Sequence, residues 1–177
     1  MILCLALCLT ARADVFYQYT GNPFNSVAGE VTHDDFISVI LRLPDSLPVA
    51  LARTPLLPIS WSVFDGHSTI TNQDADLLIF EIGTDATGLV NDWRVEAGSL
   101  AVNRDMGTSG KIISSVVEYN LIGSDFTSSV FPFATLGQTL GNPGFWVDPP
   151  VPTPEPATVL LLLPITILLF VRKRQFS

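Results

Sequence analysis

The sequence predicts an all-β protein: an antiparallel β-sandwich, followed by a Pro-rich spacer and a single C-terminal transmembrane helix. Three observations lead to this prediction. Short runs of alternating apolar and polar residues are separated by clusters of Gly, Asp, Asn and Pro. Helical periodicity is absent from the body of the chain. After a Pro-rich stretch, fifteen residues without charge run from 157 to 171.

The clearest strand signal lies at the middle of the chain. Residues 59–63 alternate apolar residues with Ser, and a second short run covers 67–71. Asp65 and Gly66 stand between them, and Asp-Gly favours a type I′ turn, which needs positive φ at both residues. We therefore expect a β-hairpin here.

Further strands are expected on both sides of this hairpin. Residues 76–83 and 89–96 form two runs, and 84–88 supply the turn between them. In the second run Trp93 and Val95 point to the core, and the opposite face is polar: Asp92, Arg94 and Glu96. Residues 14–20 and 36–43 also read as strands, and 141–146 are expected to end the last strand. The run 111–121 is predicted as one strand with these core residues: Ile113, Val117, Tyr119 and Leu121.

Composition limits the classes of function. Both cysteines, Cys4 and Cys8, precede the predicted domain at 14–147, so this domain is expected to fold by core packing alone. The whole chain carries a net charge of −8. Loss of Arg12 and of the three cations at 172–174 would leave five basic residues against 17 acidic ones, a charge of −12. Such a surface repels nucleic acid, so no nucleic-acid partner is expected.

The first thirteen residues read as a secretory signal peptide. Residues 2–9 are apolar, and Ala11 and Ala13 form an A-x-A cleavage pattern, so the mature chain is expected to begin at Asp14. This leader has no basic n-region and is short. We therefore expect the true start to lie upstream.

The other end of the sequence has three parts. Residues 148–156 form a Pro-rich spacer, which favours an extended conformation. The apolar run 157–171 would be roughly 22 Å long as a helix, marginal for a hydrocarbon core of about 30 Å, and Pro164 is tolerated in membrane helices. Residues 172–177 begin with Arg172, Lys173 and Arg174, which the positive-inside rule places in the cytoplasm.

Within this tail, Pro154 and Pro156 hold Glu155 on an extended stretch beside the membrane. The ordered set of Pro154-Glu155-Pro156, an apolar span and the Arg172-Lys173-Arg174 cluster resembles the PEP-CTERM sorting signal of exopolysaccharide-producing bacteria. The resemblance implies recognition by exosortase, a membrane-embedded cysteine protease. It also implies export to the cell envelope or the extracellular matrix. A permanent membrane anchor is the alternative for the same segment.

The body resembles a recurring ectodomain of PEP-CTERM proteins, in residues 16–24, 60–66 and 84–88. That family has no assigned activity, so the resemblance implies fold and location only.

Catalytic and metal-binding patterns are sparse. Residues 14–147 contain no Cys, and the sequence contains no G-x-S-x-G elbow. His33 stands beside Asp34 and Asp35, where a catalytic dyad is one interpretation and a solvated turn the favoured one. His67 opens a hairpin strand, and a structural role is favoured for it as well. No catalytic residue or cofactor is predicted.

Asn72, Asp74 and Asp76 have the alternate spacing of calcium-loop ligands. An EF-hand is rejected because Leu77 and Gly83 stand where Gly and Glu are required. A surface calcium held by Asp74, Asp76 and a neighbouring loop is the alternative to an ordinary polar loop, which is favoured. No metal site is predicted.

Three tryptophans raise the question of sugar stacking. Trp61 and Trp93 lie on apolar strand faces, so core packing is expected for both. Trp146 lies in a Gly- and Pro-rich segment and is the candidate for an exposed ligand contact. The leading hypothesis is an exported, non-enzymatic envelope or matrix protein. Its alternatives are a carbohydrate-binding module associated with exopolysaccharide and an extracellular hydrolase.

Overall fold

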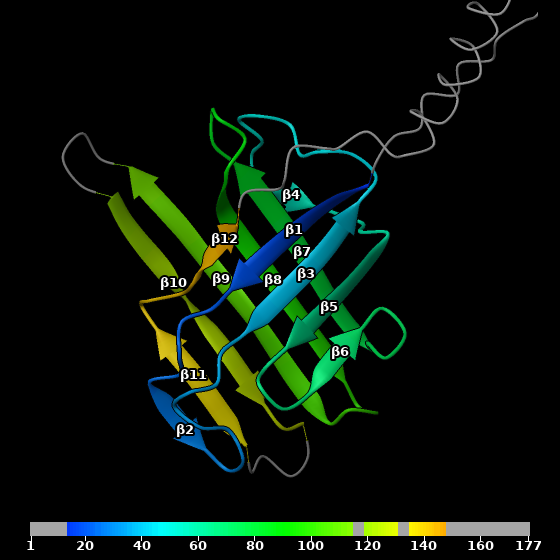
Figure 1. The fold of residues 1–177 in the computed structure, drawn as a ribbon, viewed down its shortest axis with the longest axis vertical. Coiled ribbons are helices and arrows are strands. Elements are labelled where there is room, and N and C mark those ends of the chain that lie inside the picture. Colours follow the sequence, from blue (N-terminus) through cyan, green and yellow to red (C-terminus); the bar gives the residue numbers. More distant parts are fainter. Residues whose placement is uncertain (1–13, 115–118, 131–134, 148–177) are drawn as a thin grey trace, which may run out of the picture.

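The computed structural model describes residues 14–114, 119–130 and 135–147. The predicted leader, spacer, transmembrane helix and basic tail lie outside these residues. The predicted all-β class is confirmed: the described residues form two antiparallel sheets that face each other (Figure 1). Among them, no helix is long and apolar enough to cross a lipid bilayer.

The smaller sheet has five strands, in the order β12-β1-β3-β5-β6. It lies in front in Figure 1. Its strands are β1 (Val15–Thr20), β3 (Ser38–Leu43), β5 (Ser60–Phe64), β6 (Thr69–Thr71) and β12 (Phe145–Val147).

The larger sheet has seven strands, in the order β2-β11-β10-β9-β8-β7-β4. Five consecutive strands, β7 to β11, pair with their neighbours in sequence. The strands are β2 (Ser26–Ala28), β4 (Thr54–Pro55), β7 (Leu77–Thr84), β8 (Val90–Ser99), β9 (Arg104–Ser114), β10 (Tyr119–Ser128) and β11 (Leu136–Leu140).

One strand prediction is wrong. The run 111–121 belongs to two strands, because β9 ends at Ser114 and β10 begins at Tyr119, and the two pair antiparallel. The intervening sequence has no Gly, Pro, Asn or Asp, so the alternation of the two strands looked continuous. The last described strand is β12, which ends at Val147, one residue beyond the expected end at 146. The last strand of the larger sheet, β11, ends at Leu140, and β12 joins β1 in the other sheet.

The hairpin of β5 and β6 is confirmed, but its turn is not type I′. Gly66 has a φ of 100°, whereas Asp65 is absent from the residues with positive φ. The Asp65 carboxylate accepts hydrogen bonds from the N–H groups of His67 (2.9 Å) and Ser68 (2.7 Å). An Asx-type turn built on this side chain therefore replaces the two-residue turn.

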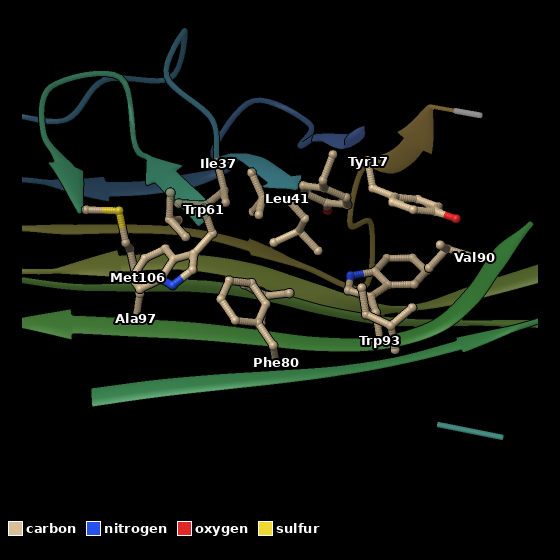
Figure 2. Packing of buried hydrophobic residues seen from close by; sticks show 14 of the residues in the cluster. Tyr17, Ile37, Leu41, Trp61, Phe80, Val90, Trp93, Ala97 and Met106 are labelled. Carbon is tan, nitrogen blue, oxygen red and sulfur yellow. The ribbon is translucent and has the colours of Figure 1, made fainter. Parts of the chain in front are cut away.

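The hydrophobic core lies between the sheets (Figure 2). Trp61 and Phe80 meet edge to face with ring centroids 5.3 Å apart, which joins β5 to β7. Trp61, Trp93 and Val95 are buried as predicted, and Arg94 is exposed. The core residues predicted in the run 111–121, Ile113, Val117, Tyr119 and Leu121, lie outside the residues whose side chains the structure describes.

The inner face of the larger sheet changes character along its width. On β7 and β8 it is apolar, whereas on β9, β10 and β11 it carries buried polar side chains: Arg104, Thr108, Asp125, Thr127 and Thr139. The segment between β1 and β3 covers part of this region, with Phe24 buried against Gly137. A buried polar face requires hydrogen-bond partners, and these connect the two sheets.

Candidate functional site

The first polar connection between the sheets is centred on Asp65. This side chain follows β5 and is fully buried. Besides its two turn hydrogen bonds, it accepts one from the Thr127 hydroxyl on β10 (2.8 Å) and one from Arg104 Nε on β9 (3.3 Å). One carboxylate thus links the β5–β6 turn to two strands of the opposite sheet.

Arg104 extends this connection toward the surface. Its guanidinium forms ion pairs with Asp65 and with Glu30, which is half exposed, and it donates to the Asn103 carbonyl oxygen (3.1 Å). Burial lowers the pKa of Arg104 below its ordinary value. The guanidinium remains charged at neutral pH, since this value starts far above 7. The buried charge is therefore held between two carboxylates.

The second connection joins Tyr19 on β1 to Asp125 on β10. The Tyr19 hydroxyl donates to Asp125 Oδ1 (2.6 Å) and accepts from the N–H of Gly144 (2.5 Å). Burial, together with the neighbouring Asp125 charge, raises the pKa of Tyr19. Burial raises the pKa of Asp125 to about 6, and the hydrogen bond from Tyr19 opposes this rise. Because Gly144 directly precedes β12, this hydrogen-bonded group also fixes the start of that strand.

Both connections are structural in geometry. Asp65, Asp125 and Tyr19 have no measurable exposure, so a substrate could reach their reactive atoms only by opening the sandwich. Their donors and acceptors are used to hold the sheets together. Sequence reasoning missed these groups, although the alternation of Asp125 and Thr127 on a strand is a readable sign of a polar inner face.

The histidines are arranged differently from the dyad considered from the sequence. His33 Nδ1 lies 2.7 Å from the carbonyl oxygen of Phe24, whereas Asp35 pairs with His67, whose Nε2 is 2.9 Å from Asp35 Oδ2. Burial alone would raise the pKa of Asp35, but hydrogen bonds from Thr32 and from His67 outweigh it and lower that pKa.

The Asp35–His67 pair requires the glycine beside it. Gly66 has a left-handed φ of 100°, and a Cβ at this position would overlap the Asp35 carboxylate. The pair is partly exposed and joins two loops at one end of the sandwich. Its partial exposure is that of a surface contact.

The proposed calcium ligands lie in a hydrogen-bonded loop. Asp74 Oδ2 accepts from the Thr71 hydroxyl (2.6 Å), and Asp76 Oδ2 accepts from the N–H of Leu100 (2.8 Å). Within the described ranges, no group of three or more His, Cys, Asp or Glu side chains is placed to hold a metal ion.

Trp146 is not the exposed aromatic residue that was expected. It is partly buried, and its ring packs against Tyr19 (centroids 5.4 Å apart) and Trp93 (6.5 Å). Its Nε1 is buried without a hydrogen-bond partner. The cause is strand alternation: β12 turns Trp146 toward the core and its neighbours outward, with Phe145 60% exposed.

Among the residues whose burial the structure describes, the exposed aromatic side chains lie on the outward face of the five-stranded sheet. Phe16, Phe64 and Phe145 are 51%, 38% and 60% exposed and come from β1, β5 and β12. Residues with polar, uncharged side chains surround them on the same face: Gln18, Thr20, Ser38, Ser60, Ser62, Thr69 and Thr71. We call this surface the aromatic face. The period-two pattern of residues 14–20 and 60–64 could have located Phe16 and Phe64 from the sequence.

The outward face of the seven-stranded sheet is charged instead. Asp92 forms ion pairs with Arg53 (3.1 Å) and Lys111 (3.0 Å), and Arg94 pairs with Glu96 (2.9 Å). The two outward faces of one molecule therefore differ in chemistry. One carries several ion pairs, and the other carries aromatic and uncharged polar side chains with one ion pair, Arg42–Asp14.

The residues of the predicted sorting signal and of the leader cleavage site lie outside the described residues. They are Ala11, Ala13, Pro154, Glu155, Pro156, Arg172, Lys173 and Arg174. Comparisons of this chain with protein-family models, with curated proteins and with solved structures found no match.

Proposed function

We propose that this chain is an exported, non-enzymatic protein of the cell envelope or extracellular matrix, sorted through residues 154–174. The observation that carries the proposal is the order of three features: Pro154-Glu155-Pro156, the apolar run 157–171 and the cluster Arg172-Lys173-Arg174. In this proposal the partner is an exosortase-type membrane protease, and the β domain is the protein that it delivers.

Physical chemistry supports this use of the segment. Pro at 154 and 156 disfavours helix, so Glu155 is presented on an extended stretch that a protease cleft can accommodate. The apolar run favours the bilayer, and the cations favour the headgroups on the cytoplasmic side. With the cations on the cytoplasmic side, the apolar run between them would put Glu155 at the other surface of the membrane.

The described part of the domain supports a non-enzymatic role. Its fully buried acids, Asp65 and Asp125, are hydrogen-bonded between the sheets rather than directed into a cleft. The Asp35–His67 pair is the nearest arrangement to an acid–base dyad and is the basis of the alternative, an extracellular hydrolase. A panel of glycosidase and esterase substrates, with His67→Ala as the control, tests that alternative.

The sorting proposal is tested in the native host with Glu155→Ala and with a second variant in which Arg172, Lys173 and Arg174 are all Gln. We expect both to accumulate as an unprocessed precursor in the membrane, whereas Glu81→Ala, a surface acid of the domain, is processed normally. Unchanged mass of the released protein in both tail variants would refute the proposal. Membrane retention of the wild type with an intact tail would favour a permanent anchor.

A further inference from the structure

The sorting proposal makes no use of the aromatic face. The pairing registers define its geometry. Phe145 is opposite Thr20, Thr20 is opposite Ser38, and Ser38 is opposite Phe64, so the two phenylalanines share one row across four strands. With strands about 4.8 Å apart, they are roughly 14 Å apart.

The third ring lies off this row. Phe16 precedes Thr20 by four residues on β1, a distance of roughly 13 Å along the strand. The three rings therefore form a wide triangle on one side of a sheet. Hydroxyl and amide side chains occupy the positions between them, together with Ile40 and Val147, which are 43% and 44% exposed.

The scarcity of charged side chains distinguishes this surface from the outward face of the seven-stranded sheet. Among the outward positions of its five strands, Arg42 is the one charged side chain, and it is paired with Asp14. The chain as a whole has 17 acidic residues and a net charge of −8. An anionic ligand would be repelled by that net charge, and a cationic ligand would favour the acids of the other sheet.

The spacing of the rings also argues against a protein partner. A stable interface buries about 800 Å² on each side around a continuous apolar centre. Here hydroxyl and amide groups interrupt the apolar side chains, so such a centre is not formed. Separated rings with hydrogen-bonding groups between them suit a long polar ligand. An exposed aromatic ring can stack on the C–H surface of a sugar, and hydroxyl side chains can hydrogen-bond sugar hydroxyls.

We propose that the aromatic face binds a neutral polysaccharide, with Phe16, Phe64 and Phe145 as stacking positions. This proposal is independent of the sorting signal and assigns the contact to residues other than Trp146, whose ring lies in the core. The neutrality of the face selects uncharged chains over uronic-acid polymers.

Binding is measured with the full chain in nanodiscs of zwitterionic lipid, against amorphous cellulose, galactomannan, soluble starch and alginate, with empty nanodiscs as the baseline. We expect binding to at least one neutral polymer and none to alginate. Phe16→Ala and Phe145→Ala should each weaken binding roughly three- to tenfold. Leu140→Ala on the other sheet is the matched control, since Leu140 is 61% exposed and Phe145 is 60% exposed.

All four proteins should have the same melting temperature, because these side chains are exposed. Absence of binding to every neutral polymer overturns the proposal, as does a preference for alginate or binding that both Phe variants leave unchanged. Self-association that depends on the three rings, seen by sedimentation velocity, would assign the face to a second copy of the chain. None of these outcomes bears on processing of the tail, so failure here leaves the sorting proposal intact.

Discussion

Replacing Asp65 tests whether one buried carboxylate holds the two sheets together. In Asp65→Ala, the Arg104 guanidinium loses its buried partner and keeps Glu30, and the Thr127 hydroxyl loses its acceptor. The turn N–H groups of His67 and Ser68 lose theirs as well. Breaking a buried ion pair by removing one partner costs about 3–5 kcal/mol.

This loss is large compared with the whole stability of a small domain, about 5–15 kcal/mol. We expect the variant to melt roughly 10–20 °C lower than the wild type. Asp65→Asn should lose less, because the Asn side-chain oxygen can still accept the turn hydrogen bonds. The assay is urea and thermal unfolding of the full chain, followed by the fluorescence of the buried tryptophans.

The matched control is Asp14→Ala. Asp14 also pairs with an arginine, Arg42, but both side chains of that pair are partly exposed. A surface pair of this kind contributes about 0–1 kcal/mol. If Asp65→Ala lowers stability no more than Asp14→Ala does, the assignment of Asp65 as the connection between the sheets is wrong.

Two further predictions concern the core. A Cβ at Gly110 would overlap the Trp93 ring, so Gly110→Ala should lower the free energy of unfolding by about 1–3 kcal/mol. Gly98→Ala is the control and should lower it less, because its Cβ would lie 3.3 Å from that of Leu77. Equal melting temperatures of the two variants would contradict this packing. Folding raises the pKa of Asp125 from 3.8 to about 6, so the folded state binds this proton more tightly. The contribution of Asp125 to stability therefore falls as the pH rises from about 4 to about 6, by about 3 kcal/mol, and Asp125→Asn should remove this part of the pH dependence. The difference between wild-type and variant unfolding free energies at pH 4 and pH 7 measures it, and parallel pH profiles would refute the assignment.

The all-β class was predictable because period-two alternation and turn residues act locally. The hairpin around Asp65 and Gly66 and the burial of Trp93 follow from such local signals. The β9–β10 boundary was missed because no turn residue marks it. The sheet to which Phe145–Val147 belongs was also missed, because pairing with β1 connects positions more than a hundred residues apart.

The candidate sites likewise combine features that local sequence signals predict with features that depend on long-range pairing. The sequence shows which positions of a strand face one way, but not which face is covered by the other sheet at an isolated three-residue strand such as β12. Trp146 was therefore expected outside and lies inside, and Phe145 is the reverse. The pairing of Asp35 with His67 rather than with His33 likewise depends on how two loops meet.

The most direct test of the sorting proposal is the location and intact mass of the wild-type protein in its native host. Cell fractionation followed by mass spectrometry gives both values in one experiment. The proposal predicts protein in the envelope or the medium, with a chain that ends within or beside residues 154–156. Recovery from the cytosol with residues 157–177 still attached would contradict it.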